Sequence, residues 1–174
     1  MQQSVIIGVL LAIMVIAYKV GRRRSLSVVG GPKKVRDLHS LPSYYGFYAA
    51  LWAGLPALIL LAVWVAFQSS IVTNLVVSEL PAEVRDLPEN ELSLVLNDIR
   101  NLVSGNIVSA DIDQTMRSAA DHYLELQTIS HAALGVVILT MGMAAIAILM
   151  RIIAPGLRAR NQVENIIKWI LIAC

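Results

Sequence analysis

Three long apolar stretches constrain this chain more than any other feature of its sequence. They lie at residues 1–20, 46–68 and 132–153, and their only charged side chains, Lys19 and Arg151, stand near the ends. A helix of about 20 apolar residues crosses the hydrocarbon core of a bilayer, and a long basic side chain near its end can reach the headgroups. We therefore predict an all-α membrane protein with three transmembrane helices.

The composition excludes most other classes of protein. Of the 174 residues, 57% are hydrophobic and 15% are charged, whereas soluble domains have about 45–50% apolar and about 25% charged residues. A soluble globule of this length could not cover three uncharged helices, so a soluble enzyme and a disordered tail are both excluded. Because Cys174 is the only cysteine, an intrachain disulfide and a cysteine-based metal cluster are excluded as well.

Both ends of the chain carry apolar runs. The residues before the first run are uncharged and basic residues follow it, which favours an uncleaved transmembrane helix over a secretory signal. Residues 166–174 are apolar except for Lys168, but they are too few to cross a bilayer. We expect residues 154–174 to combine a linker with the start of a fourth transmembrane helix that a longer protein would complete.

The net charge of +2 separates into three blocks along the chain. Residues 19–45 carry seven basic side chains and one acidic side chain. Residues 69–131 carry three basic and ten acidic side chains, and residues 151–174 carry four basic side chains and one acidic side chain. Lys and Arg accumulate on the cytoplasmic side of membrane proteins. Residues 21–45 and the linker are therefore predicted inside, whereas residues 69–131 and the N-terminus are predicted outside.

The loop at residues 21–45 contains a basic cluster, which we interpret as the charges that set the orientation of the spans. Its arginine triplet could also bind nucleic acid or anionic lipid. No nucleic-acid motif is present, and no aromatic residues alternate with the basic ones, so binding of nucleic acid is not supported. We expect membrane lipids and no nucleic acid as partners. The cluster consists of Arg22, Arg23, Arg24, Lys33, Lys34 and Arg36.

The outer segment at residues 69–131 is predicted to contain two helices that pack against each other. One begins at Pro88 and stops at Gly105, because proline suits the first turn of a helix and glycine its C-terminal end. The other runs from about Ala110 to Ile153, since no helix breaker separates it from the third span, and a shorter helical turn is expected at residues 81–87. Apolar stripes at helical spacing support both long helices. The first stripe is Leu92, Val95, Leu96, Ile99, Leu102 and Val103, and the second is Ile112, Met116, Ala119, Ala120, Tyr123, Leu124 and Gln127.

The acidic residues of the outer segment raise the question of a metal or catalytic site. Asp111 and Asp113 would diverge on a helix, whereas Asp121 and Glu125 could share a face with His122 nearby. A solvated acidic face explains these residues without a metal ion. The sequence lacks a Ser-His-Asp arrangement, a glycine-rich phosphate loop and a Cys-His cluster. We therefore predict no catalytic, metal-binding or cofactor-binding residue and no enzymatic activity.

The second span carries a face of small residues. Ala49, Ala53 and Ala57 follow one another at a spacing of four, and Ala50 is related to Gly54 in the same way. Such spacing lets two helix backbones approach closely. The face can pack the span within its own chain or dock a helix of a partner, and these two uses do not exclude each other. Because no span has an ionisable residue near its middle, the spans are not expected to form a transport pathway by themselves.

The order of these segments resembles a known family. An apolar span, the string GRRRSLSVVGG, the string LHSLPSYYGFYAALWAGLPALILL, an acidic segment and a third span follow one another. This order is similar to the N-terminal region of PstC, the permease subunit of bacterial phosphate ABC transporters. The tail RARNQVENIIKWILIAC resembles the start of the first core permease helix in that family. The resemblance covers essentially the whole chain but only the N-terminal part of the family's protein.

The resemblance implies an inner-membrane component of an ATP-driven phosphate importer, with its outer segment in the periplasm. The implied partners are a second permease subunit (PstA), an ATP-binding subunit (PstB) and a periplasmic phosphate-binding protein. No substrate-contacting or coupling residue of the family falls on these positions, so the implied role is assembly, anchoring or regulation. From the residues alone, two other hypotheses stay open: a stand-alone membrane scaffold or sensor with an outward-facing helical hairpin, and a membrane enzyme with an acidic external site.

Overall fold

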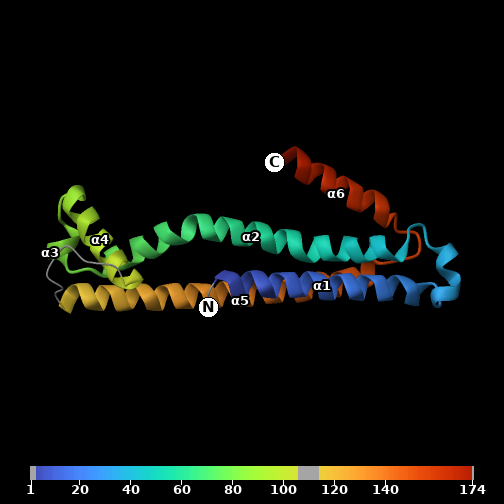
Figure 1. The fold of residues 1–174 in the computed structure, drawn as a ribbon, viewed down its shortest axis with the longest axis horizontal. Coiled ribbons are helices and arrows are strands. Elements are labelled where there is room, and N and C mark those ends of the chain that lie inside the picture. Colours follow the sequence, from blue (N-terminus) through green and yellow to red (C-terminus); the bar gives the residue numbers. More distant parts are fainter. Residues whose placement is uncertain (1–2, 106–113, 174) are drawn as a thin grey trace. The chain divides into compact units, whose positions relative to one another are not determined.

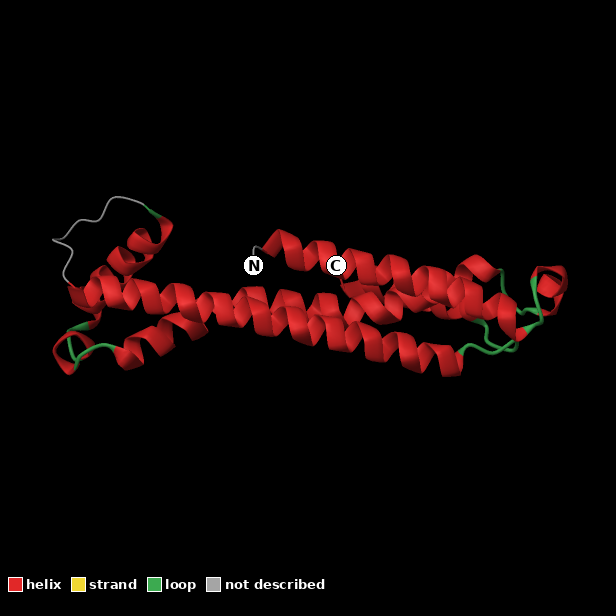
Figure 2. Ribbon diagram, turned by 90° about the horizontal axis from the view of Figure 1, so that it is seen from below, coloured by secondary structure: helices red, strands yellow, loops and turns green. Residues whose placement is uncertain are grey.

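The computed structural model describes residues 3–105 and 114–173, and every regular element in those residues is a helix (Figure 2). The all-α prediction is therefore confirmed. The elements are α1 (Gln3–Val28), the 3-10 helix η1 (Pro32–Asp37), α2 (Pro42–Glu79), α3 (Ala82–Arg85), α4 (Glu89–Ser104), α5 (Gln114–Ile152) and α6 (Ala159–Ala173).

Three helices are long and apolar enough to cross a membrane, namely α1, α2 and the part of α5 from Met116 to Ile152. A helix suits this environment because hydrocarbon offers no water to the backbone N–H and C=O groups, and a helix pairs them internally. The chain is therefore a multi-pass membrane protein. The helices continue beyond the predicted spans, α1 to Val28 and α2 to Glu79. The boundaries of the membrane segments stay predictions, since a helix can extend past the bilayer.

The chain forms two compact units, which are described separately. Unit 1 comprises residues 1–61 and 134–174, and unit 2 comprises residues 62–133. Both boundaries fall inside helices, so α2 and α5 each contribute residues to both units. Unit 1 holds α1, η1 and α6 as well, and unit 2 holds α3 and α4.

In unit 1, α1 packs against both α2 and α5 (Figure 1). Its buried residues recur every three or four positions along one stripe, which is the spacing of a single helix face. The closest approach is at Gly21, where a Cβ atom would lie 2.6 Å from the Cβ of Ala49 and 2.7 Å from the backbone oxygen of Tyr45. Gly142 of α5 meets Ile13 in a similar way, since a Cβ there would lie 2.7 Å from Ile13 Cγ2. Glycine is therefore required where α1 meets each of its neighbours.

Hydrogen bonds join the chain segments at the end of unit 1 where α1 ends and α2 begins. The Tyr45 hydroxyl donates to the carbonyl oxygens of Leu157, at 2.9 Å, and Pro155, at 3.3 Å. Arg24 Nε donates to the carbonyl oxygen of Met150 in the last turn of α5, at 3.1 Å. The backbone N–H of Arg160 donates to the hydroxyl of Ser40, which brings the start of α6 to the loop before α2.

Unit 2 has its own apolar core. The core consists of Val72, Val76, Leu80, Ile99, Ala119 and Ala120, with Leu92, Val95, Leu96, Leu102, Val103 and Tyr123 packed against it. The predicted packing of the two apolar stripes is thereby confirmed. Val72 and Val76 of this core lie at the end of α2, and Leu80 directly follows that helix; these residues were assigned to the outer segment but to neither of its two predicted helices.

The ends of α4 follow the predicted signals. Pro88 precedes its first residue, and Gly105 ends it in the left-handed region with φ 75°. The short helix α3 lies within the predicted turn at residues 81–87. One member of the second stripe was wrong, because Leu124 is 42% exposed and Leu126 packs against the core instead. The predicted start of the long helix at Ala110, together with Ile112, lies outside the described residues.

Replacement of Gly21 by alanine should destabilise unit 1 by roughly 1–3 kcal/mol, the usual cost of overpacking a tight core. The added methyl group would meet the backbone of α2, which cannot move away as a flexible side chain could. The measurement is the thermal unfolding midpoint of the purified protein in a mild detergent. Gly8→Ala in the same helix is the matched control, because a Cβ on Gly8 has nothing within 4 Å. Equal midpoints for the two variants would contradict the predicted close contact.

Replacement of Tyr45 by phenylalanine should cost about 0.5–1.5 kcal/mol, since two carbonyl oxygens lose their common donor. The loss should be local, with faster amide hydrogen exchange in residues 154–160 than in the wild-type protein. Tyr44→Phe serves as the control, because the ring that lies 5.9 Å from the Arg160 guanidinium carbon is retained. If exchange in this segment were unchanged by Tyr45→Phe, the hydroxyl would not hold the linker in place.

Candidate helix-docking site

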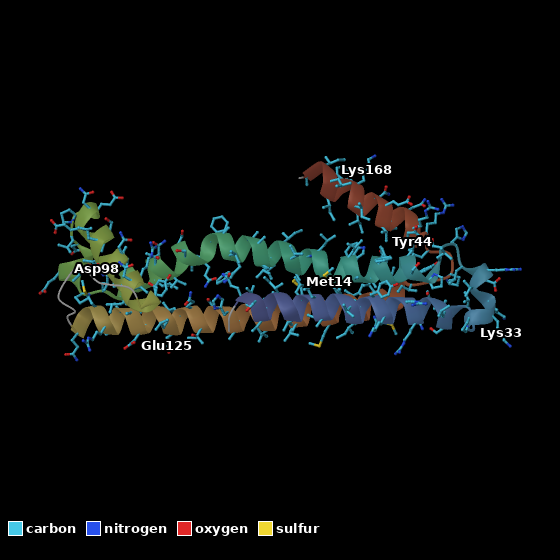
Figure 3. The ribbon with its side chains drawn as sticks, in the orientation of Figure 1. Met14, Lys33, Tyr44, Asp98, Glu125 and Lys168 are labelled. Atoms are coloured by element: carbon cyan, nitrogen blue, oxygen red, sulfur yellow. The ribbon has the colours of Figure 1, made fainter. Side chains whose placement is uncertain are left out.

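The predicted face of small residues is largely buried within the chain itself. Ala49 and Ala53 are 2% exposed and Ala57 is fully buried. Gly54 is covered by Met14 of α1, which lies between α1 and α2 in Figure 3. Ala50 is half-buried. The structure thus gives this face a use in packing α2 within its own chain, and its use in docking a partner helix stays a prediction.

A second apolar feature of unit 1 is a groove between α2 and α5, with a volume of about 270 Å³. All of its lining residues are apolar, and several are small. They are Trp52, Ala53 and Pro56 from α2 and Met141, Ala144, Ala145, Ile148, Leu149 and Ile152 from α5. Ala53 is the one member of the predicted face that also lines the groove. We define this feature as the α2–α5 groove.

Sequence reasoning missed the groove because its two walls belong to spans that are far apart in the chain. The adjacent alanines Ala144 and Ala145 were the available signal, since small residues in a span often mark a helix contact. Apolar side chains elsewhere on unit 1, such as Leu58 and Ile59, are exposed and suit contact with lipid. The groove differs from them because it is concave and can receive a ridge of side chains.

The six residues of the basic cluster gather at the end of unit 1 where α1 ends. Arg22 and Arg23 are exposed on the last turns of α1, whereas Arg24 is half-buried and donates a hydrogen bond to the carbonyl oxygen of Met150. The remaining three, Lys33, Lys34 and Arg36, are exposed on η1, and Figure 3 shows Lys33 pointing away from the helices. Gly30 and Gly31 make the turn before η1 possible, because both have positive φ angles.

Arg160 at the start of α6 lies at the same end of unit 1 and has a partner of its own. Its Nε lies 2.7 Å from Glu164 Oε1, one turn further along α6. The hydrogen bond and the negative charge of Glu164 raise the pKa of Arg160. This exposed pair supports the first turn of the helix and contributes little to stability.

Unit 2 contains an open pocket with a volume of about 640 Å³ near the junction of α2 and α3. His122 lines it, and its Nε2 lies 3.0 Å from Glu79 Oε2. Asp121 and Glu125, which were weighed with His122 as metal ligands, are both exposed. In the part of the chain that the structure describes, no three His, Cys, Asp or Glu side chains are grouped as metal ligands. Asp111 and Asp113 lie outside the described residues.

Sequence reasoning also missed a buried polar pair in unit 2. Gln68 and His131 are both buried, and their Nε2 atoms are 3.1 Å apart. The nitrogen of the Gln68 amide donates in this contact, and the ring nitrogen of His131 accepts. The pair joins α2 to α5 through side chains that are 63 positions apart in the chain. Its function is to satisfy two polar groups that would otherwise be buried without partners.

Comparison with known proteins places the chain in a protein family. Residues 7–174 match the family DUF3708, which is described as "Phosphate ATP-binding cassette transporter". No curated protein and no solved structure matches the chain. The match covers nearly the whole chain and agrees with the predicted resemblance to phosphate ABC transporters at the level of the family. This multi-pass membrane protein therefore belongs to the DUF3708 family of phosphate ATP-binding cassette transporters.

Proposed function

We propose that this chain is the N-terminal membrane extension of a PstC-type permease subunit in the bacterial inner membrane. Its role is to assemble and anchor an ATP-driven phosphate importer, without chemistry of its own. The partners are then the second permease subunit PstA, the ATP-binding subunit PstB and a periplasmic phosphate-binding protein. The family match and the order of the segments support this proposal.

The distribution of charge supports both the orientation and the absence of a transport path. The basic end of unit 1 is assigned to the cytoplasm, where PstB binds, and the acidic outer segment to the periplasm. Transport paths through membranes depend on ionisable residues within the spans. The three spans have none near their middles. The substrate path is therefore assigned to another part of the transporter, and the spans described here to support.

The single observation that carries the assembly role is the α2–α5 groove. In lipid, helices associate through close packing, because acyl chains are as apolar as the side chains they would displace. A concave surface with Ala53, Ala144 and Ala145 at its walls allows a third helix to approach more closely than a convex surface does. We assign a transmembrane helix of PstA as the occupant, since a permease of this class contains a second subunit of that kind.

Replacement of Ala144 by leucine should fill the groove and weaken the association with PstA. Overpacking costs roughly 1–3 kcal/mol, which corresponds to roughly 5- to 150-fold weaker binding. The measurement is the amount of PstA and PstB that co-purifies with the tagged protein from membranes. Ala144 is exposed within the chain, so the substitution should leave the thermal unfolding midpoint of unit 1 unchanged.

Ala147→Leu provides the matched control for this experiment. Ala147 is also an exposed alanine of α5, but it does not line the groove. Co-purification should be normal for this variant. If Ala144→Leu also co-purified normally, the groove would not be where the permease subunits meet.

An in-frame deletion of the codons for residues 1–150 should test the role of the whole extension. Phosphate uptake and the yield of the assembled complex should fall together, because the subunits would lack a membrane contact. A strain that lacks the entire phosphate transporter gives the baseline. Normal uptake with a normal yield of complex would contradict the assembly role and favour a stand-alone scaffold or sensor.

A further inference from the structure

The basic end of unit 1 holds far more positive charge than the acidic groups beside it can balance. Unit 1 contains eleven basic residues and two acidic ones, Asp37 and Glu164. Glu164 is already engaged by Arg160. An unbalanced charge of this size in one small unit attracts anions strongly.

Nine of these basic side chains are exposed, and no hydrogen bond or ion pair within the described residues engages them. One of the nine, Lys168, lies further along α6. The other eight come from α1, η1, the last turn of α5 and the linker after it. The eight are Lys19, Arg22, Arg23, Lys33, Lys34, Arg36, Arg151 and Arg158. We define them as the basic collar.

The basic collar lies where the apolar surface of the spans ends. On α1, the exposed residues Val15 and Ile16 lie just before Lys19. On α5, Ile152 is exposed directly after Arg151, and in the loop before α2, Leu41 is 63% exposed. Side chains that follow lipid-facing residues so closely lie at the depth of the headgroups, with their stems along the apolar surface.

We propose that the basic collar binds the headgroups of anionic phospholipids. Its cations are spread over four segments of the chain, so they match a plane of many phosphates and not a single enclosed anion. A free phosphate ion would need several donors that converge on one point, and a nucleic acid would need aromatic stacking surfaces among the cations. The collar offers neither, whereas a charged leaflet presents its phosphates at this depth. The proposal does not depend on the assignment of the chain to PstC.

The fixed geometry of this end favours such binding. The hydrogen bonds of Tyr45 and Arg24 already hold the ends of α1, α2 and α5 together. The collar therefore loses little freedom of its backbone when lipids bind, and only the long side chains need to be ordered. Bound headgroups would in turn keep the turn that contains η1 at the membrane surface.

The test uses the purified chain, reconstituted into phosphatidylcholine vesicles with a trace of spin-labelled lipid. Electron paramagnetic resonance gives the association constant of labelled phosphatidylglycerol relative to labelled phosphatidylcholine. We expect phosphatidylglycerol to be preferred several-fold at low salt. The preference should fall between 0.1 M and 1 M NaCl, where the Debye length shrinks from about 10 Å to about 3 Å. Equal association of the two lipids at low salt would overturn the proposal.

A triple variant with Lys33→Gln, Lys34→Gln and Arg36→Gln tests the collar directly. The several-fold preference should fall towards equal association of the two lipids, because each neutralised residue loses its attraction to the charged surface. These exposed side chains on η1 take no part in the packing of the spans, so the variant should fold. The control is the double variant with Arg85→Gln and Arg117→Gln in unit 2, which should keep the wild-type preference. An unchanged preference in the triple variant would overturn the proposal.

Inorganic phosphate distinguishes a lipid surface from a site for the free ion. At equal ionic strength, phosphate and chloride should reduce the preference for phosphatidylglycerol equally, because both act only by screening. If phosphate displaced the labelled lipid at a much lower ionic strength than chloride, the collar would be a site for the free ion, and the lipid proposal would be wrong. The salt series uses only the wild-type chain, so it remains decisive even if the triple variant inserts poorly.

Discussion

The arrangement of unit 1 depends on the close approach of α1 to α2 at Gly21. Lipid provides no hydrophobic force between helices, so contact at short range must hold them together. Gly21 touches the backbone of Tyr45, and the hydroxyl of the same tyrosine holds the linker at Pro155 and Leu157. The position of α6 therefore depends on a glycine, which has no side chain, at position 21 of α1. A larger residue at position 21 would displace the tyrosine on which the linker depends.

The helices themselves could be predicted because their causes are local. Apolar length identified α1, α2 and α5, and Pro88 and Gly105 marked the two ends of α4, although Pro88 lies just before the first residue of that helix and not in its first turn. Hydrophobic periodicity also identified most of the core of unit 2. The same periodicity wrongly assigned Leu124 to the core. Spacing alone does not say which edge of an apolar stripe faces the core, and Leu124 lies on the exposed edge.

The candidate site could be predicted only in part, because it depends on contacts between distant segments. The alanines of α2 were visible as a face, but their spacing does not say whether the covering helix belongs to the same chain. Ala144 and Ala147 look alike in the sequence, yet only Ala144 lines the groove. Tyr45 stands next to Tyr44 in the sequence, and no local pattern distinguishes the two. Its role depends on carbonyl groups that lie 110 and 112 positions further along the chain.

The two units differ in what they present to their surroundings. Unit 1 combines an apolar exterior with an excess of basic residues, and unit 2 encloses a small core beneath an acidic surface. Apolar and basic surfaces suit a bilayer with negative headgroups, whereas an acidic surface suits solvent. The same division of charge thus supports the membrane location of unit 1, its proposed lipid contacts and the outward assignment of unit 2.

The bond from Arg24 to Met150 has a consequence for the order in which the protein is made. The two residues are 126 positions apart, so at about 5–20 residues per second a ribosome needs roughly 6–25 s to produce the second after the first. Both α1 and α2 are completed within that interval, before the carbonyl group that receives Arg24 exists. The contact between Gly21 and Ala49 can form long before then. The first hairpin must therefore remain in the membrane on its own contacts until the third span arrives to complete it.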